Sequence, residues 1–339
     1  MPHTVEAKPG WLARLKEFEG AVDRKALLQL LDTLVPYLIL FTAMLFTSRL
    51  GAPLWVTLLL ALPAGAFLMR TFILFHDCCH GSFLSSRRAN DGLGRILGVL
   101  VLTPFGDWRR SHGIHHGTSG NLDRRGLGDV WTMTVEEYRA SPPLRRLLYR
   151  FYRNPITLFI LGPFFTFVLM NRLPSRGAGA RQIRDLVIHD AAFLGLGLGL
   201  SLLFGPATWA LVQGSTIFVG GIAGIWMFYV QHQFDPTYWA RNGSWSSLEA
   251  ALQGSSWYRL PPVAQWITGN IGLHHVHHLC PRIPNYRLQD CLEAIPELRL
   301  PQSMSFLRSL RSIRLNLWDE AASTLVSFRG LRRAAGTAG

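Results

Sequence analysis

Two long stretches of apolar residues constrain the fold of this chain more than any other feature. Residues 53–75 read PLWVTLLLALPAGAFLMRTFILF with Arg70 as the single charge, and residues 209–230 read WALVQGSTIFVGGIAGIWMFYV with no charge. A helix of about 20 apolar residues crosses the roughly 30 Å of hydrocarbon in a bilayer. Residues 31–46 and 186–204 are weaker candidates with polar groups at or near their ends. The chain is therefore predicted to be an integral membrane protein.

Four crossings in two hairpins are the arrangement that places the polar segments together. The hairpins are expected to pair residues 31–48 with 53–75, and 186–204 with 208–230. The apolar stretches 93–105 and 155–170 are short for crossings and are predicted to be interfacial or re-entrant. The predicted fold is all-α, with four transmembrane helices and a cytosolic helical cap. Its expected parts are a cytosolic or interfacial segment (1–28), a membrane domain (29–295) and a basic amphipathic tail lying on the membrane (296–339).

The net charge of +13 at first suggests a nucleic-acid partner, but the placement of the charge argues against it. Arginines collect between the second and third apolar crossings. Basic residues concentrate on the cytoplasmic side of membrane proteins, where they also face anionic lipids. The four cysteines form no disulfide framework, which fits a reduced compartment. We therefore expect the polar segments on the cytoplasmic side of a bacterial inner membrane, with no nucleic acid bound.

The twelve histidines are concentrated in clusters with helical spacing. An H-x-x-H-H array occurs twice, and a third cluster reads HDCCH. Spacings of three and four residues bring side chains onto one face of a helix. Neutral imidazole suits iron, zinc, copper and nickel, whereas magnesium and calcium prefer oxygen ligands. The predicted transition-metal ligands of the three clusters are His76, His80, His112, His115, His116, His274, His277 and His278.

Eight histidines are too many for one ion but suffice for two ions with three to five ligands each. His232 leaves the last crossing at the depth expected of the first cluster and would be a ninth ligand. A transporter would place ligands near the bilayer midplane, whereas these clusters all follow helix ends. A non-catalytic metal-binding or transport protein is therefore the remote alternative. Two redox-capable irons could activate dioxygen, and a site at the membrane face implies a lipid-like substrate.

The motifs HDCCHGSF, SHGIHHGTSGNLD, QHQF and GLHHVHHLCPRIPNY resemble those of the membrane fatty acid desaturase family. The similarity covers about residues 30–295 and is greatest to the bacterial and plastid-type delta-12 (omega-6) branch. It implies a di-iron, O2-dependent enzyme that introduces a cis double bond into an acyl chain. It also implies a fatty acyl lipid, acyl-CoA or acyl carrier as substrate, with electrons from ferredoxin or a cytochrome b5-like protein.

The resemblance assigns the three clusters to the three histidine boxes of the family, and His232 resembles the extra ligand between the second and third boxes. Cys79 departs from the family, in which many members have glycine at this position. His275 is an added histidine that is predicted to point away from the ligand face and to have a structural role. His189 lies outside the clusters and is assigned no function.

Further residues receive weaker hypotheses. The side chains of Asp77, Asn121 and Asp123 could accept hydrogen bonds from ligating histidines, or form a helix end and a turn. The aromatic residues Trp226, Phe228 and Tyr229 could line an acyl tunnel or anchor the helix at the interface. The segment Trp108-Arg109-Arg110 could dock an acidic electron donor or face lipid and solvent.

Related chemistry remains open at the same predicted centre. Membrane hydroxylases, acetylenases, alkane hydroxylases and carotenoid oxygenases resemble desaturases in their histidine boxes. The residues do not distinguish desaturation from hydroxylation, nor do they define the double-bond position, chain length, acyl carrier, electron donor or oligomeric state.

Overall fold

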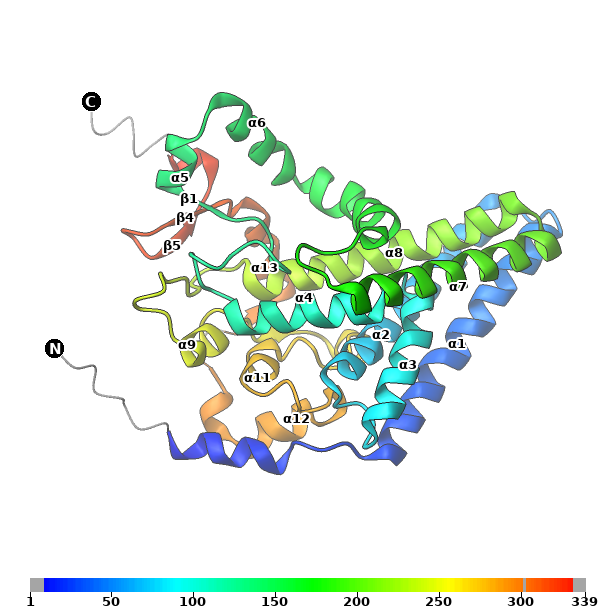
Figure 1. Ribbon diagram of the computed structural model, residues 1–339, viewed down its shortest axis with the longest axis horizontal. Coiled ribbons are helices and arrows are strands. Elements are labelled where there is room, and N and C mark those ends of the chain that lie inside the picture. The colour runs from blue at the N-terminus through cyan, green and yellow to red at the C-terminus, as the bar shows by residue number, and fades with distance from the viewer. Residues whose placement is uncertain (1–8, 301–302, 332–339) are drawn as a thin grey trace.

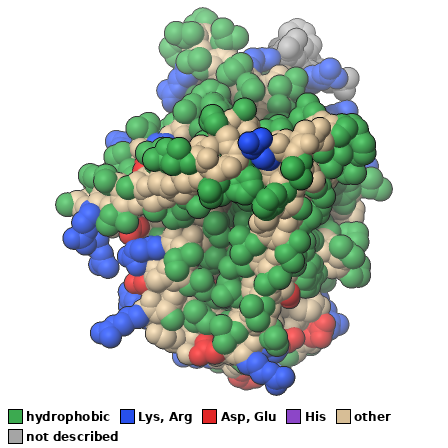
Figure 2. Space-filling view, turned by 90° about the vertical axis from the view of Figure 1, so that its right-hand side faces the viewer, with side chains coloured by type: hydrophobic (Ala, Val, Ile, Leu, Met, Phe, Trp, Pro, Cys, Tyr) green, Lys and Arg blue, Asp and Glu red, His purple; other side chains and the backbone are tan. Residues whose placement is uncertain are grey.

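The computed structural model describes residues 9–300 and 303–331 and is mostly helical (Figure 1). Its four longest helices have the length and apolar composition needed to cross a membrane. They are α1 (Asp23–Arg49), α2 (Leu54–His80), α7 (Ala180–Phe204) and α8 (Pro206–His232). Hydrophobic side chains cover most of the face in Figure 2, which views the end where the α1–α2 and α7–α8 connections lie. The chain is a membrane protein.

All four helices extend beyond the apolar segments expected from the sequence. Two of these extensions carry histidines: α2 continues to His80, and α8 continues to His232. Gly81 ends α2 with a φ of 69°, a left-handed conformation that glycine adopts without strain. The helical continuations place the first histidine cluster and His232 beyond the apolar part of each returning helix.

Helices α2 and α8 pack closely because glycines face each other at their crossing. A Cβ atom added to Gly220 would lie 2.9 Å from the carbonyl oxygen of Gly65 and 3.2 Å from Cδ2 of Leu68. Small residues allow this approach of helix backbones, which replaces the hydrophobic driving force that is missing inside a bilayer. The crossing holds the two helices that carry His76 and His232 in a fixed relation.

We expect Gly220→Ala to destabilise the protein by about 1–3 kcal/mol, because the added methyl group overpacks this crossing. Gly224→Ala on the same helix is the matched control, since a Cβ atom there meets nothing within 4 Å. Thermal unfolding of the two purified variants in detergent measures the difference. Equal melting temperatures for Gly220→Ala and Gly224→Ala would contradict the proposed close contact.

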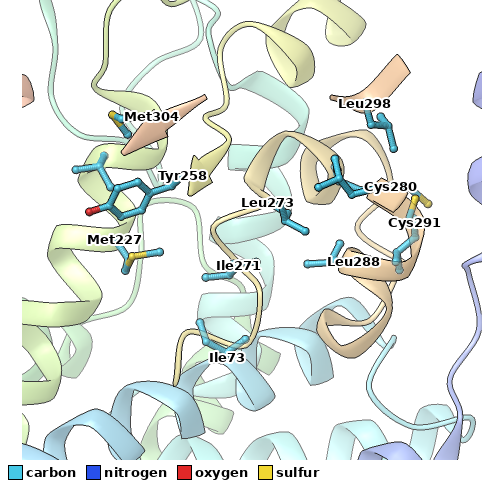
Figure 3. Close-up of a cluster of buried hydrophobic side chains, with 14 of the residues drawn as sticks. Ile73, Met227, Tyr258, Ile271, Leu273, Cys280, Leu288, Cys291, Leu298 and Met304 are labelled. Atoms are coloured by element: carbon cyan, nitrogen blue, oxygen red, sulfur yellow. The ribbon is translucent and has the colours of Figure 1, made fainter. Parts of the chain in front are cut away.

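Short helices and strands form a cap over the end of the bundle where the histidines lie. The helices of the cap and its connections are η1 (Gly10–Glu17), α3 (Arg87–Leu100), α4 (Phe105–Thr118), α5 (Val135–Ala140), α6 (Pro143–Tyr152), η2 (Ile156–Leu161), η3 (Phe164–Leu169), η4 (Met170–Arg172), α9 (Ser247–Leu252), α10 (Pro262–Ile267), α11 (His274–Leu279), α12 (Asn285–Ala294), η5 (Pro296–Leu298), α13 (Phe306–Ser309) and η6 (Leu310–Arg314). A buried apolar cluster joins the cap to α2 and α8 (Figure 3). In it, Ile73 of α2 lies near Ile271 and Leu273, which directly precede α11.

The expectation of an all-α fold is wrong in one respect, because the cap contains two small sheets. Their strands are β1 (Met133–Thr134), β2 (Tyr258–Arg259), β3 (Met304–Ser305), β4 (Leu317–Asp319) and β5 (Thr324–Val326). Strand β4 pairs with β1 in parallel and with β5 in antiparallel orientation, and β2 pairs with β3 in parallel.

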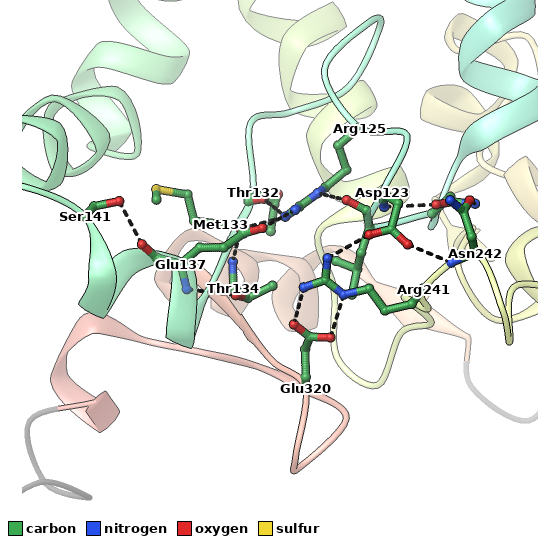
Figure 4. Close-up of polar contacts among 12 residues, drawn as sticks. Asp123, Arg125, Thr132, Met133, Thr134, Glu137, Ser141, Arg241, Asn242 and Glu320 are labelled. Atoms are coloured by element: carbon green, nitrogen blue, oxygen red, sulfur yellow. Dashed lines mark hydrogen bonds and ion pairs between the residues drawn. The ribbon is translucent and has the colours of Figure 1, made fainter.

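The C-terminal segment also differs from the expected amphipathic tail on the membrane. Leu317 and Trp318 of β4 are buried in the cap. The guanidinium group of Arg241 contacts Glu320 at 2.6 Å and Asp123 at 2.8 Å, tying the β4–β5 hairpin to the loop after α4 (Figure 4). Strand pairing and burial therefore make residues 303–331 part of the cap, although the basic face predicted around Arg308 remains exposed.

The N-terminal segment likewise turns its apolar side toward the protein. Leu15 and Phe18 are buried in the cluster that contains α12, and the Arg14 guanidinium donates to the carbonyl oxygen of Ala294 at 2.7 Å. Glu19 forms an ion pair with Arg282. Apolar side chains of the segment that was expected to be cytosolic or interfacial thus pack against the cap.

The segment from α6 to η4 is bent by 61° and could count as a fifth, broken span. Its apolar stretch, residues 155–170, is flanked by two arginines that contact residues at the cap side of the bundle. Arg153 donates to Gln233 just beyond the end of α8, and Arg172 donates to the carbonyl oxygen of Leu102 just beyond the end of α3. A segment that starts and ends on the same side fits the predicted interfacial or re-entrant element.

Candidate metal centre

All nine predicted histidines lie together at the cap end of the bundle, in two groups. Within each group, one potential ligand atom per residue lies within 4.8 Å of all the others. One group contains His76, His80, His112, His116 and His277, and the other contains His115, His232, His274 and His278. The second and third clusters each contribute to both groups, so the arrangement could hold two metal ions with five and four imidazoles.

Helical spacing explains how neighbouring histidines reach different groups. His112 and His116 are four residues apart on α4 and point the same way, with their Nε2 atoms 3.1 Å apart. His115 points to the other group, where its Nε2 atom lies 3.1 Å from Nε2 of His232. The histidines of helix α11 are divided in the same way. His277 belongs to the first group, with its Nε2 atom 3.1 Å from His116 Nε2, whereas His274 and His278 belong to the second.

The hydrogen bonds of His115 and His232 define which ring nitrogens carry protons. His232 Nδ1 lies 3.1 Å from the carbonyl oxygen of Gly254, which can only accept, so this nitrogen must donate. His115 Nδ1 lies 2.7 Å from a carboxylate oxygen of Asp129 and donates in the same way. In the neutral rings, both Nε2 atoms therefore carry lone pairs. Two lone pairs facing each other at 3.1 Å repel unless a cation lies between them.

The spacing of the facing nitrogens fits metal coordination. Two nitrogen ligands about 2.1 Å from one ion and at a right angle to each other lie about 3.0 Å apart. The Nε2 atom of His232 lies 3.0 Å from Nε2 of His274. His80 Nε2 and His278 Nε2 are buried and have no hydrogen-bond partner among the described residues. Both groups thus have the nitrogen positions and the unpaired atoms that a metal ion would satisfy.

The surroundings favour neutral imidazoles. Burial, followed by the neighbouring imidazoles, lowers the pKa values well below the ordinary value for the cap histidines His112, His116, His274, His277 and His278. Neutral imidazole is the form that binds metals. The cap therefore presents ligands that need no proton removal near neutral pH.

Two carboxylates contact the Nδ1 atoms of rings in the two groups. Asp77, which the sequence predicted for this role, lies 3.1 Å from Nδ1 of His76 and accepts hydrogen bonds from the backbone and side-chain nitrogens of Asn285. Sequence reasoning missed Asp129, which binds His115. Gly128 has a φ of 77°, and a Cβ atom there would lie 2.9 Å from Cβ of His115. The glycines around Asp129 were the available signal of a close backbone approach.

The predictions for Asn121 and Asp123 as hydrogen-bond partners of histidine are wrong. The Asn121 amide donates to Asn242 at 3.0 Å, and its side-chain oxygen accepts from the backbone nitrogen of Asp123. Asp123 pairs with Arg241 and accepts from the backbone nitrogen of Asn242 (Figure 4). The two residues form the turn that was the alternative reading.

His275, His189 and Cys79 lie outside both groups. His275 Nε2 donates to the carbonyl oxygen of Leu298 at 2.9 Å, and burial lowers its pKa to about 4. It points away from the ligand face, as predicted. His189 Nε2 donates to the carbonyl oxygen of Gly98 at 3.0 Å. Cys79 lies in an apolar cluster around α2 and α3.

The predicted donor-docking segment is arranged differently from the expectation. Trp108 stacks on His112, with ring centroids 4.2 Å apart and planes inclined by 19°. Arg109 pairs with Asp91 at 2.7 Å, and Arg110 donates to the hydroxyl of Ser175 at 3.0 Å. The tryptophan therefore packs on a ring of the site, and both arginines have partners within the chain.

The three aromatic residues suggested for an acyl tunnel lie in different surroundings. Phe228 borders the site, with its ring centroid 5.6 Å from that of His115. The Tyr229 hydroxyl donates to the carbonyl oxygen of Ser312 at 2.9 Å, and the Trp226 indole donates to the Tyr258 hydroxyl at 3.4 Å. Of the three, Phe228 has a ring that packs against the histidine groups.

We expect Asp129→Asn to lower the affinity for the metal of the second group about 10–100-fold, the usual effect of losing a carboxylate behind a ligating histidine. Asp123→Asn is the matched control, because it removes the same charge from a contact with Arg241. Elemental analysis after dialysis against a graded chelator series measures the effect. If the two variants release metal at the same chelator concentration, the role assigned to Asp129 is wrong.

Comparison with known proteins agrees with this site. The family model described as fatty acid desaturase matches residues 53–308. The chain is 44% identical over 315 residues to a fatty acid desaturase of Bacillus subtilis, covering 93% of this chain and 89% of that protein. It is 29% identical to the sn-1 oleoyl-lipid 12-desaturase of Synechocystis sp., covering 66% of this chain and 64% of that protein.

It is also 26% identical to the ferredoxin-type sn-2 acyl-lipid omega-3 desaturase of Arabidopsis thaliana chloroplasts, covering 76% of this chain and 60% of that protein. The chain belongs to the fatty acid desaturase family. It is accordingly an oxidoreductase whose histidine groups could hold metal.

Proposed function

We propose that this protein is a di-iron, O2-dependent membrane desaturase that introduces a cis double bond into a fatty acyl chain, with delta-12 (omega-6) regiospecificity. The observation that carries the proposal is the pair of buried imidazole groups with facing lone pairs at the membrane end of the cap. The proposed ligands are His76, His80, His112, His116 and His277 for one iron, and His115, His232, His274 and His278 for the other.

Iron suits both the ligand type and the reaction. Imidazole nitrogen is a good ligand for iron and for zinc, but zinc has no redox chemistry. Desaturation removes two hydrogens from an unactivated alkyl chain. With two electrons and two protons supplied by a donor and solvent, one O2 becomes two waters. A bound di-iron pair would supply the O2-dependent oxidising chemistry that amino-acid side chains lack.

The residues of the chain have four tasks in this proposal. The nine histidines bind the metals as neutral rings. Asp77 and Asp129 accept the distal N–H groups of His76 and His115, which orients the rings and raises their basicity. Trp108 and Phe228 cover the rings with apolar surface, which excludes water. The extended α2 and α8 hold the site near the membrane, within reach of a lipid chain.

Acyl lipid is the proposed substrate form, and ferredoxin or a cytochrome b5-like protein is the proposed separate electron donor. The names of the Synechocystis and Arabidopsis relatives specify acyl lipids, and the Arabidopsis name specifies ferredoxin. The arginine-rich cap supports a location on the cytoplasmic side of a bacterial inner membrane, because basic segments are retained there.

Expression in a host that makes monounsaturated but no polyunsaturated fatty acids tests the proposal. We expect the intact chain, with a ferredoxin system, to yield a dienoic acid in the host lipids, detected by gas chromatography–mass spectrometry. The control is His277→Ala, which removes one proposed ligand and should reduce the product by at least 100-fold.

Each of the other possible products would change the proposed function in a defined way. A hydroxy acid would replace desaturation by the related hydroxylase reaction at the same site. A double bond at another position would overturn the delta-12 assignment and keep the desaturase. Absence of any acyl product, with two irons per chain and a working donor, would overturn the acyl substrate in favour of an alkane or carotenoid.

A further inference from the structure

A cavity of about 730 Å³ lies beside the metal centre and has no part in the function described so far. The first turns of α1, the middle of α2, and the segment from β2 through α10 surround it. Its walls combine cationic and apolar side chains. Lys25, Arg70 and Arg259 provide three positive charges against one carboxylate, that of Asp32.

The guanidinium group of Arg70 is a buried positive charge in the lining of the cavity. Its side chain is only 3% exposed although it lies on a membrane-spanning helix. Its Nε donates to the Thr33 hydroxyl at 2.9 Å, and its guanidinium lies 3.9 Å from the ring centroid of Trp266. The half-exposed Asp32 contacts it at 3.2 Å. Such a buried charge within an apolar helix is costly and usually marks a functional site.

The rim carries positive charge that is not neutralised by its neighbours. Arg259 is exposed, and within residues 9–300 and 303–331 it has no ion-pair partner. Lys25 pairs with Asp290 at 3.3 Å, but both side chains are about half exposed, so water screens this contact. An entering anion would therefore meet two exposed cations, Lys25 and Arg259, and the buried guanidinium of Arg70.

The remaining walls of the cavity are partly apolar and partly formed by the side-chain amides of Gln29, Gln265, Asn270 and Gln289. Leu260, Leu273 and Trp257 line it. The exposed side chains of Trp266 on α10 and Leu28 on α1 also line it. Positive charge together with exposed tryptophan and leucine side chains fits a molecule that has an anionic head and hydrocarbon chains.

We propose that this cavity binds the phosphodiester head group of a membrane glycerophospholipid whose acyl chain is the substrate of the neighbouring metal centre. The inference rests on the proposed desaturase function and names its substrate class as phospholipid. Arg70 and Arg259, with Lys25, contact the phosphate, while Trp257 and Trp266 pack on the glycerol and upper chain region.

The cavity adjoins both histidine groups through the chain itself. Leu273 directly precedes His274, and Arg70 lies six residues before His76, about 9 Å along the helix axis. A buried hydrogen-bond path also leads from the cavity to the site. The Gln29 amide donates to Asn285 at 2.6 Å, Asn285 donates to Asp77 at 2.9 Å, and Asp77 accepts from His76. A head group held here lies within one lipid length of the metals.

Lipid binding to the delipidated, metal-loaded full chain tests the proposal without using desaturase activity. The probe is short-chain dihexanoyl phosphatidylglycerol, titrated and counted by native mass spectrometry. We expect the double variant Lys25→Gln/Arg259→Gln to raise the Kd at least tenfold. The matched control is Arg87→Gln/Arg88→Gln, which removes two exposed charges at the start of α3 and should leave the Kd within twofold.

Two further ligands distinguish the possible sources of the anion. Inorganic phosphate should compete only at concentrations far above the lipid Kd, and uncharged dihexanoylglycerol should bind weakly and equally to all three proteins. Equal lipid Kd values for the two double variants would overturn the proposal. So would inorganic phosphate binding as tightly as the lipid, which would indicate a site for a free anion.

A result on binding is separable from a result on catalysis. Phospholipid binding that depends on Lys25 and Arg259, in a protein that forms no dienoic acid, would support the cavity and overturn the proposed reaction. Dienoic acid formed on phospholipid by an enzyme whose lipid Kd ignores both residues would overturn the cavity assignment and keep the reaction. Melting temperature and metal content of each variant confirm that it is folded.

Discussion

Repulsion between buried lone pairs is the constraint on which the rest of this structure depends. His115 and His232 each donate a proton from Nδ1 to an oxygen, so their Nε2 atoms face each other without protons at 3.1 Å. His274 approaches the same point from a third element. Such an arrangement is unfavourable in an empty protein and favourable around cations. The fold therefore brings together, at the end of a membrane bundle, imidazole groups that could hold metal.

Each level of the fold contributes to holding these rings in place. Close glycine packing fixes α2 against α8, and the helices continue past their apolar segments to carry His76 and His232. The cap then covers the rings with α4 and α11. Its loops bring Asp129 behind one ring, and α12 brings Asn285 behind Asp77. Strand β4 closes the cap by pairing with β1 on one side and with β5 on the other.

The spanning helices and the histidine set could be predicted because both depend on local spacing. Hydrocarbon thickness defines the length of a crossing, and the helical period defines which histidines share a face. The hydrogen-bond partners of the histidine Nδ1 atoms were harder to predict, because they depend on how loops fold. Asn121 and Asp123 were closer in sequence to His116, yet a turn directs them to Arg241 and Asn242. Asp129 reaches His115 only because glycines let the loop return.

Metal stoichiometry of the purified full chain tests the central claim most directly. Elemental analysis should find about two transition-metal ions per wild-type chain. The double variant His232→Ala/His274→Ala, which halves the second group, should retain about one ion while the five-histidine group keeps its own. A wild-type chain that binds one ion or none, or a double variant that still binds two, would contradict the assignment of two separate imidazole groups.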